Sequence, residues 1–169
     1  MSFGISHDTA EFSCDNFKYN WNSVLQGIYS HATTIMLLCD GGGSNSSSSR
    51  LFKQGLIRVS KDLHVDIIVT LYPLHIEVNP IEPWLFSQIT RVWSGISFES
   101  VEQARELAAE TRMKSDLCAF TNIIRKKYDT SRCVDSNDDV CQRHITFDKE
   151  LPKWNYKFSW RDKKYQVNF

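Results

Sequence analysis

The stretch Leu63–Leu71, with the sequence L-H-V-D-I-I-V-T-L, has the clearest pattern in the chain. Apolar residues occupy every second position of this stretch, and most of the positions between them are polar. The side chains of a strand point alternately to its two faces, so this period of two predicts a strand with one buried face. We therefore expect this strand to form the centre of a sheet.

Shorter runs on both sides of this strand predict its partners. Leu56–Val59 is expected as one neighbour. Residues 74–78 either form a hairpin with the central strand, which would complete an antiparallel meander, or continue it as one bent strand. Trp154–Trp160 alternates strictly and is followed by a second alternating run over residues 165–169, which predicts a C-terminal hairpin. Residues 33–38 and 144–147 are expected as two further short strands.

Three segments have helical patterns. Asn16–His31 carries apolar residues three and four positions apart, which predicts an N-terminal helix. Pro83–Trp93 is expected as a short helix. Ser97 or Ser100 should cap a long central helix that continues to about Tyr128, and Ser100 with Gln103 matches a capping box. The predicted class is therefore α+β, with a small antiparallel sheet, made of the meander and the C-terminal hairpin, packed against the N-terminal and long central helices.

The length of 169 residues fits one α+β domain that covers residues 1–169. Within residues 40–50 lies the tract G-G-G-S-N-S-S-S-S, a composition that is typical of a flexible coil. Two interpretations of this tract remain open. It is either a natural surface loop or an engineered joint between residues 1–39 and 51–169.

Composition narrows the choice of partner and compartment. Lys and Arg number 20 and so do Asp and Glu, so the net charge of zero gives no general attraction to nucleic acid or to anionic membranes. No apolar run approaches the ~20 residues that cross a bilayer. The N-terminus lacks a signal pattern and the five cysteines are an odd number, which favours a reducing compartment. We expect a cytoplasmic or nuclear protein with no membrane partner.

A search for catalytic and metal-binding motifs finds none that is specific. The chain contains no phosphate-binding loop, no nucleophile elbow and no H-E-x-x-H helix. A zinc site would have to use Cys118, Cys133, Cys141 and His144, but no C-x-x-C pair is present. Neither a cofactor nor a metal is therefore expected. Whether Cys133 and Cys141 are free, bridged or metal-bound stays open.

Two alternative functions rest on groups of polar residues. A small enzyme or ligand-binding domain could use the polar face of the central strands, which carries His64, Asp66, His75 and Glu77. A module that binds single-stranded nucleic acid could use residues 125–164, in which basic residues alternate with aromatic ones. Seven acidic residues share that second segment, so nucleic acid is possible but not favoured.

The absence of catalytic motifs and the number of large aromatic residues favour a third function. We expect a non-catalytic protein–protein interaction domain, a subunit or adaptor of an intracellular multi-protein complex, whose partners are other proteins in a hetero-complex. Tyrosine and tryptophan are enriched where proteins bind one another. The expected interface residues are Trp154, Tyr156, Trp160, Tyr165, Trp84 and Trp93.

Overall fold

The computed structural model describes residues 1–46, 48–71, 81–111, 120–131 and 143–162. The chain forms two compact units. The single domain expected over residues 1–169 stays a prediction. The smaller unit contains residues 1–7 and 77–127, and the larger contains residues 8–76 and 128–169. Among the described residues, no helix has the length and apolar character needed to cross a membrane.

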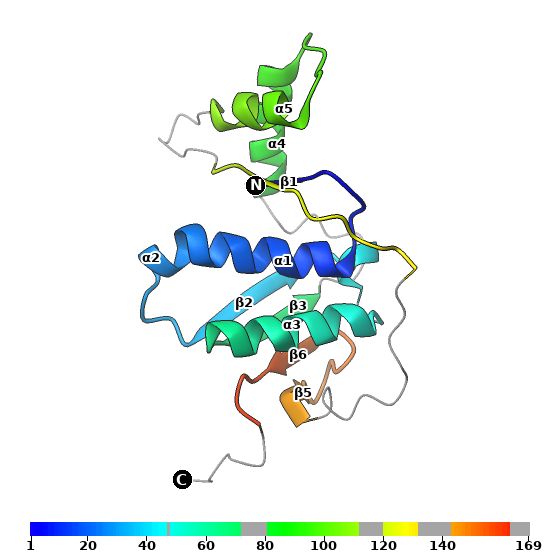
Figure 1. The fold of residues 1–169 in the computed structure, drawn as a ribbon. Helices are drawn as coiled ribbons and strands as arrows, with labels where there is room; N and C mark the ends of the chain where they lie inside the picture. Colours follow the sequence, from blue (N-terminus) through cyan, green and yellow to red (C-terminus); the bar gives the residue numbers. More distant parts are fainter. Residues whose placement is uncertain (47, 72–80, 112–119, 132–142, 163–169) are drawn as a thin grey trace. The chain divides into compact units, whose positions relative to one another are not determined.

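The larger unit is built on a four-stranded mixed sheet (Figure 1). Its strands are β2 (Thr34–Cys39), β3 (Asp66–Leu71), β5 (Ile145–Phe147) and β6 (Asn155–Phe158), in the order β2-β3-β6-β5. Strand β2 runs parallel to β3, and β6 runs antiparallel to both β3 and β5. The α+β class is confirmed. The sheet is mixed rather than antiparallel, because a parallel pair takes the place of the first part of the expected meander.

The burial expected for the central strand is confirmed. Val65, Ile67, Val69 and Leu71 are all buried, while the positions between them are partly exposed. Residues 74–78, the last strand of the expected meander, lie outside the described residues.

A helix replaces the strand that we expected at Leu56–Val59. Helix α3 (Arg50–Leu63) begins at Ser49, whose Oγ accepts a hydrogen bond from the Phe52 N–H at 3.2 Å. Phe52, Leu56 and Val59 are buried at spacings of four and three, which is the period of a helix. A run of four apolar residues taken alone does not distinguish the two structures. The cap and the buried residue one turn earlier decide in favour of the helix.

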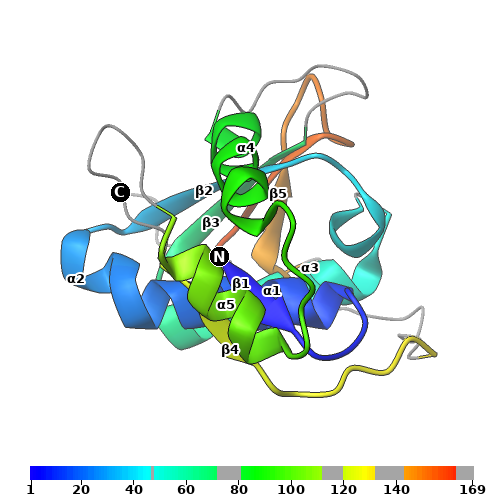
Figure 2. The ribbon, with the colours of Figure 1, turned by 90° about the horizontal axis from the view of Figure 1, so that it is seen from above.

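The N-terminal helix begins earlier than we expected. Helix α1 (Ala10–Asn20) starts at the capping residue Thr9 and continues through a π-helical turn, Trp21–Leu25, into α2 (Gln26–Ile28). Helices α1 and α3 pack against each other and lie together beside the sheet (Figures 1 and 2). Their buried side chains and the inward residues of β3 and β6 form one hydrophobic core.

The contact between α1 and α3 depends on a glycine. A Cβ atom added to Gly55 would lie 2.5 Å from the Cys14 Sγ and 3.2 Å from its Cβ. Cys14 is buried, so it has no free space to move into. We expect Gly55→Ala to lower the free energy of unfolding by about 1–3 kcal/mol through overpacking, as measured by urea denaturation.

The matched control for this prediction is Gly27→Ala in α2. A Cβ atom at Gly27 would meet nothing within 4 Å, so this change should raise stability by a few tenths of a kcal/mol up to about 1 kcal/mol. Cys14→Ala should restore part of the stability lost in Gly55→Ala, because it removes the clashing sulfur. Equal effects of Gly55→Ala and Gly27→Ala would show that the two helices are not packed in this way.

The C-terminal segment places its first strand inside the sheet rather than in an isolated hairpin. Strand β6 pairs with β3 on one side and with β5 on the other, and its Tyr156 and Phe158 are 2% and 0% exposed. The short strand expected over residues 144–147 is confirmed as β5. The second arm of the expected hairpin, residues 165–169, lies outside the described part of the chain.

The smaller unit contains β1 (Ser2–Gly4), β4 (Asn122–Ile124), α4 (Ile81–Trp93) and α5 (Val101–Ala109). The helix expected from Pro83 to Trp93 is confirmed as α4. The long central helix is wrong, because α5 ends at Ala109 and residues 122–124 form a strand parallel to β1. The β-branched residues Ile123 and Ile124 find a strand partner 120 positions earlier in the chain, which their local pattern did not reveal.

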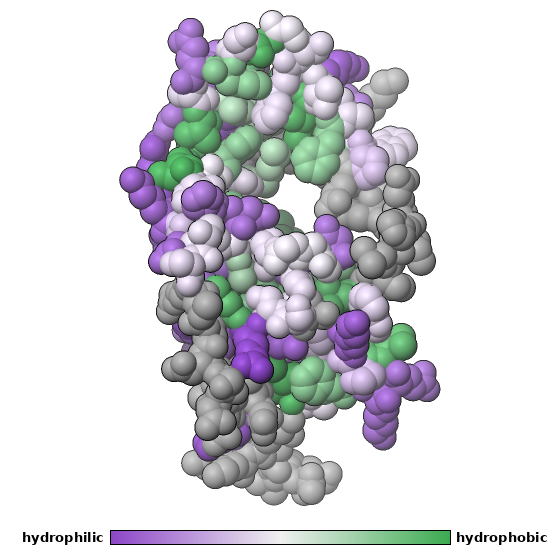
Figure 3. Space-filling model, turned by 90° about the vertical axis from the view of Figure 1, so that its right-hand side faces the viewer, coloured by the Kyte–Doolittle hydropathy of each residue, from purple (hydrophilic) through white to green (hydrophobic). Residues whose placement is uncertain are grey.

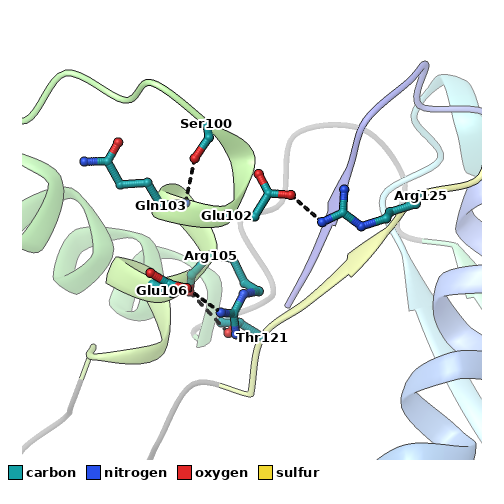
Figure 4. Close-up of polar contacts among 7 residues, drawn as sticks. All are labelled: Ser100, Glu102, Gln103, Arg105, Glu106, Thr121 and Arg125. Atoms are coloured by element: carbon teal, nitrogen blue, oxygen red, sulfur yellow. Dashed lines mark hydrogen bonds and ion pairs between the residues drawn. The ribbon is translucent and has the colours of Figure 1, made fainter.

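Polar contacts hold the start of α5 and link it to β4 (Figure 4). The Ser100 Oγ accepts a hydrogen bond from the Gln103 N–H at 3.2 Å, which confirms Ser100 as a helix cap. Glu102 forms an ion pair with Arg125, and the Thr121 hydroxyl donates to the Arg105 carbonyl at 3.3 Å. These contacts lie within the smaller unit.

Candidate functional site

A turn with an exposed aspartate follows the parallel strand β2. Asp40 comes directly after Cys39, the last residue of β2, and the chain then turns through Gly41, whose φ of +75° favours glycine. In sheets with parallel strands, ligands bind outside the carboxyl ends of the strands. Cys39 pairs with Leu71, so Asp40 lies at the end of the sheet where both β2 and β3 finish.

The carboxylate of Asp40 is held by two neighbouring groups. Its Oδ1 accepts a hydrogen bond from the Gly42 backbone N–H at 2.9 Å, and the Asn45 side chain forms another hydrogen bond to the same carboxylate. The Gly42 bond and then the Asn45 bond lower the pKa of Asp40, although slight burial opposes them. Asp40 is therefore ionised at neutral pH, exposed and fixed in orientation, as a ligand for a cation should be.

Asn45 contributes a second oxygen beside this carboxylate. It ends a single turn of 3-10 helix, Gly43–Asn45, in which its backbone N–H donates to the Gly42 carbonyl at 3.1 Å. The Asn45 Oδ1 is buried and has no hydrogen-bond partner among the described residues. A buried carbonyl oxygen without a partner costs free energy unless a ligand or water satisfies it.

The glycine–serine tract therefore connects β2 to α3 through defined hydrogen bonds. Besides the contacts of Asp40 and Asn45, the Ser49 N–H donates to the Ser46 carbonyl at 2.9 Å before Ser49 caps α3. Ser47 lies outside the described residues. The flexibility that we expected for residues 40–50 stays a prediction.

The polar constellation of the central strands is not assembled among the described residues. Asp66 pairs with Thr34 at the start of both parallel strands, at the opposite end from Asp40, and forms an ion pair with Lys157 at 2.6 Å. His64 ends α3 with a left-handed φ of 55°, and its ring packs edge-on against Trp160. The other two members, His75 and Glu77, lie outside the described residues.

The four residues that a zinc site would have to use cannot be compared as a group. Cys118, Cys133 and Cys141 lie outside the described residues. His144 is buried, and its Nδ1 lies 2.9 Å from the Ser159 carbonyl oxygen, which accounts for one ring nitrogen. Within the described ranges, no group of three or more His, Cys, Asp or Glu side chains is arranged to hold a metal ion.

The expected interface aromatics occupy different environments. In the larger unit Tyr156 belongs to the core and Trp154 packs partly against it, whereas Trp160 stacks with Arg161 at 4.5 Å. In the smaller unit Trp84 is 72% exposed, and Trp93 packs against Phe98 with ring centroids 4.9 Å apart. Tyr165 lies outside the described residues. Burial leaves Tyr156 no surface for a partner, and an interface role for the others stays a prediction.

The sequence pattern alone does not single out Asp40 as a candidate ligand. The sequence places Asp40 directly after an apolar run and directly before glycine, and ligands bind outside the carboxyl ends of parallel strands. Two features conceal this arrangement. Residues 40–50 have the composition of a coil, and the helical period of α3 is visible only when residues 50–63 are taken together. With α3 in place, residues 34–71 form a strand–helix–strand unit with Asp40 at the end where both parallel strands finish.

Comparison with known proteins gives one result. A family model described as the Rhodopirellula transposase DDE domain matches residues 1–159, which is most of the chain. No curated protein matches the chain, and no solved structure does. Our expectation of a non-catalytic interaction domain, subunit or adaptor is wrong, because the matching family consists of transposase domains.

Proposed function

Because the chain belongs to the Rhodopirellula transposase DDE domain family, we propose that it acts on DNA in transposition, with Asp40 as one of its catalytic carboxylates. A transposase must cut and join DNA strands, so nucleic acid, which the sequence did not favour, becomes the proposed partner. The observation that supports this most directly is the exposed, ionised carboxylate of Asp40 at the carboxyl edge of two parallel strands.

The family description also names the chemistry. The letters D, D and E stand for two aspartates and a glutamate, and clustered carboxylates in enzymes of DNA strand cleavage hold divalent metal ions. The described residues fit such an ion at Asp40, because the carboxylate and the unpartnered Asn45 Oδ1 are the hard oxygen donors that Mg²⁺ prefers. When bound, the ion would polarise the phosphate and activate the attacking oxygen.

The chain's own residues then have definite roles. Asp40 would hold the ion through its negative charge, and the Gly42 N–H and the Asn45 side chain would keep its carboxylate in one orientation. A Cβ atom on Gly42 would lie 3.2 Å from the Asp40 Oδ1, so glycine at this position leaves the carboxylate room. Asp66 lies at the other end of the parallel strands and cannot share the ion with Asp40.

The glutamate is assigned from its order along the chain. Glu77 and Glu82 both follow β3, and Glu82 lies in the first turn of α4, whereas Glu77 lies outside the described residues. Among the described residues, Glu82 is the first glutamate after β3 in the chain. On this order alone, we take Glu82 as the glutamate of the family description.

The test is a strand-cleavage assay on a DNA duplex with the purified chain, with and without Mg²⁺. We expect cleavage that requires the metal and stops on addition of EDTA. Glu82→Gln should abolish cleavage, and Glu99→Gln, at an exposed glutamate of the same unit, should leave it near the wild-type rate. Metal-independent cleavage, or no DNA cleavage by the wild-type chain, would contradict the proposed function.

A further inference from the structure

A lysine on α3 lies over two aromatic rings of the sheet. The Lys53 Nζ is 5.3 Å from the centroid of the Tyr156 ring and 5.6 Å from that of Phe147. Tyr156 is buried, whereas Phe147 is 48% exposed, so the rings extend from the core to the surface. Attraction to the ring faces holds the ammonium group near one position.

The rings under Lys53 lie near the end of the sheet at which Asp40 follows β2. Phe147 and Tyr156 form the last pair of β5 and β6 before the turn that joins these strands. The Leu71 N–H donates to the Trp154 carbonyl at 2.9 Å, so this turn lies beside the end of β3. Leu71 is also the residue that pairs with Cys39, directly before Asp40.

The turn between β5 and β6 adds further cations. Lys149 and Lys153 are both exposed, and the Lys153 Nζ lies 5.4 Å from the centroid of the Trp154 ring. The acidic residues of the turn are Asp148 and Glu150. The Asp148 Oδ1 accepts hydrogen bonds from the backbone N–H groups of Glu150 and Leu151, at 3.0 and 2.9 Å, and so stabilises the turn itself.

On the face that forms the right-hand side of Figure 1, hydrophilic and hydrophobic residues lie side by side among the coloured, described residues (Figure 3). Lysines supported by aromatic rings suit a nucleic-acid backbone, because each ammonium can bind a phosphate while the ring limits its motion.

We infer that Lys53, held over Phe147 and Tyr156, binds a backbone phosphate of the DNA strand that reaches Asp40. This inference rests on the proposed function. It assigns to Lys53 a role in placing the DNA rather than in the chemical step. A phosphate contact is independent of base sequence, so the effect should be seen with any duplex.

The test measures the affinity of the wild-type chain and of Lys53→Met for a mixed-sequence DNA duplex of about 30 base pairs. Each affinity is measured at several salt concentrations. Methionine keeps an unbranched apolar side chain over the rings and removes the charge. We expect binding to weaken about three- to tenfold and the salt dependence, d log K/d log[salt], to fall in magnitude by about one. The melting temperature should change by less than about 2 °C.

The control is Lys61→Met, which removes an exposed lysine from the last turn of the same helix, away from this edge. It should leave affinity and salt dependence unchanged. Wild-type affinity and salt dependence in Lys53→Met would overturn the inference, and so would a loss of folding, which would make the lysine structural. Failure of the wild-type chain to bind DNA would overturn the proposed function as well. If the wild-type chain binds DNA but does not cleave it, and Lys53→Met binds DNA more weakly, only the catalytic part of the proposed function would be overturned.

Discussion

Asp40→Asn is expected to abolish metal-dependent DNA cleavage while leaving the fold intact. The amide has nearly the shape of the carboxylate but lacks the negative charge that attracts a divalent ion. A bound metal contributes several kcal/mol to stabilising the transition state, so its loss should lower the rate by about 10³-fold or more. Asp40 is exposed and its described contacts are local, so the melting temperature should stay near the wild-type value.

The measurements are the cleavage rate and the affinity for Mn²⁺, followed by calorimetric titration. Asp66→Asn is the matched control, because Asp66 also borders a parallel strand but lies at the opposite end and is paired with Lys157. Asn45→Ala should give an intermediate loss, since it removes the hydrogen bond from the Asn45 side chain to the Asp40 carboxylate. Wild-type cleavage by Asp40→Asn, or equal losses in Asp40→Asn and Asp66→Asn, would place the metal elsewhere.

Phe158→Ala is expected to destabilise the larger unit strongly. Phe158 is fully buried, pairs with Ile67 on one side and Ile145 on the other, and packs edge-on against Tyr156 with ring centroids 5.5 Å apart. Truncation of a buried phenylalanine costs about 3–5 kcal/mol. Small domains are stable by about 5–15 kcal/mol, so this loss removes a large part of the total.

The prediction for Phe158 is checked by urea denaturation followed by circular dichroism. Leu38→Ala on β2 is the control, because Leu38 is a large apolar residue of the same sheet but is 55% exposed. It should cost less than about 1 kcal/mol. Similar losses in the two variants would show that the alternating aromatic face of residues 154–160 does not form the core.

The elements with a strong local signal were predictable. The alternation of residues 63–71 identified the buried face of β3, and the capping serine Ser100 identified the start of α5. The alternation in residues 154–160 likewise located β6. Each of these patterns extends over enough positions for the spacing of apolar residues to distinguish a strand from a helix.

The errors arose where local signals were short or depended on distant partners. Leu56–Val59 fits a strand when it is isolated and a helix when Phe52 and the cap at Ser49 are included. Residues 122–124 extend because they pair with Ser2–Gly4 at the other end of the chain. No local window contains that partner, so the expected long helix continued through them.

The sequence by itself determined the α+β class, the buried face of the central strand and the composition of the turn after Asp40. Those properties follow from alternation and residue type, which act over a few neighbouring positions. Only the tertiary structure decided that β2 and β3 are parallel, and hence that Asp40 and Asp66 lie at opposite ends of the sheet. Strand direction depends on the helix that joins the strands and on packing across the core. These are interactions between residues far apart in the chain. They place Asp40 at the carboxyl end of two parallel strands, where it becomes a candidate metal ligand.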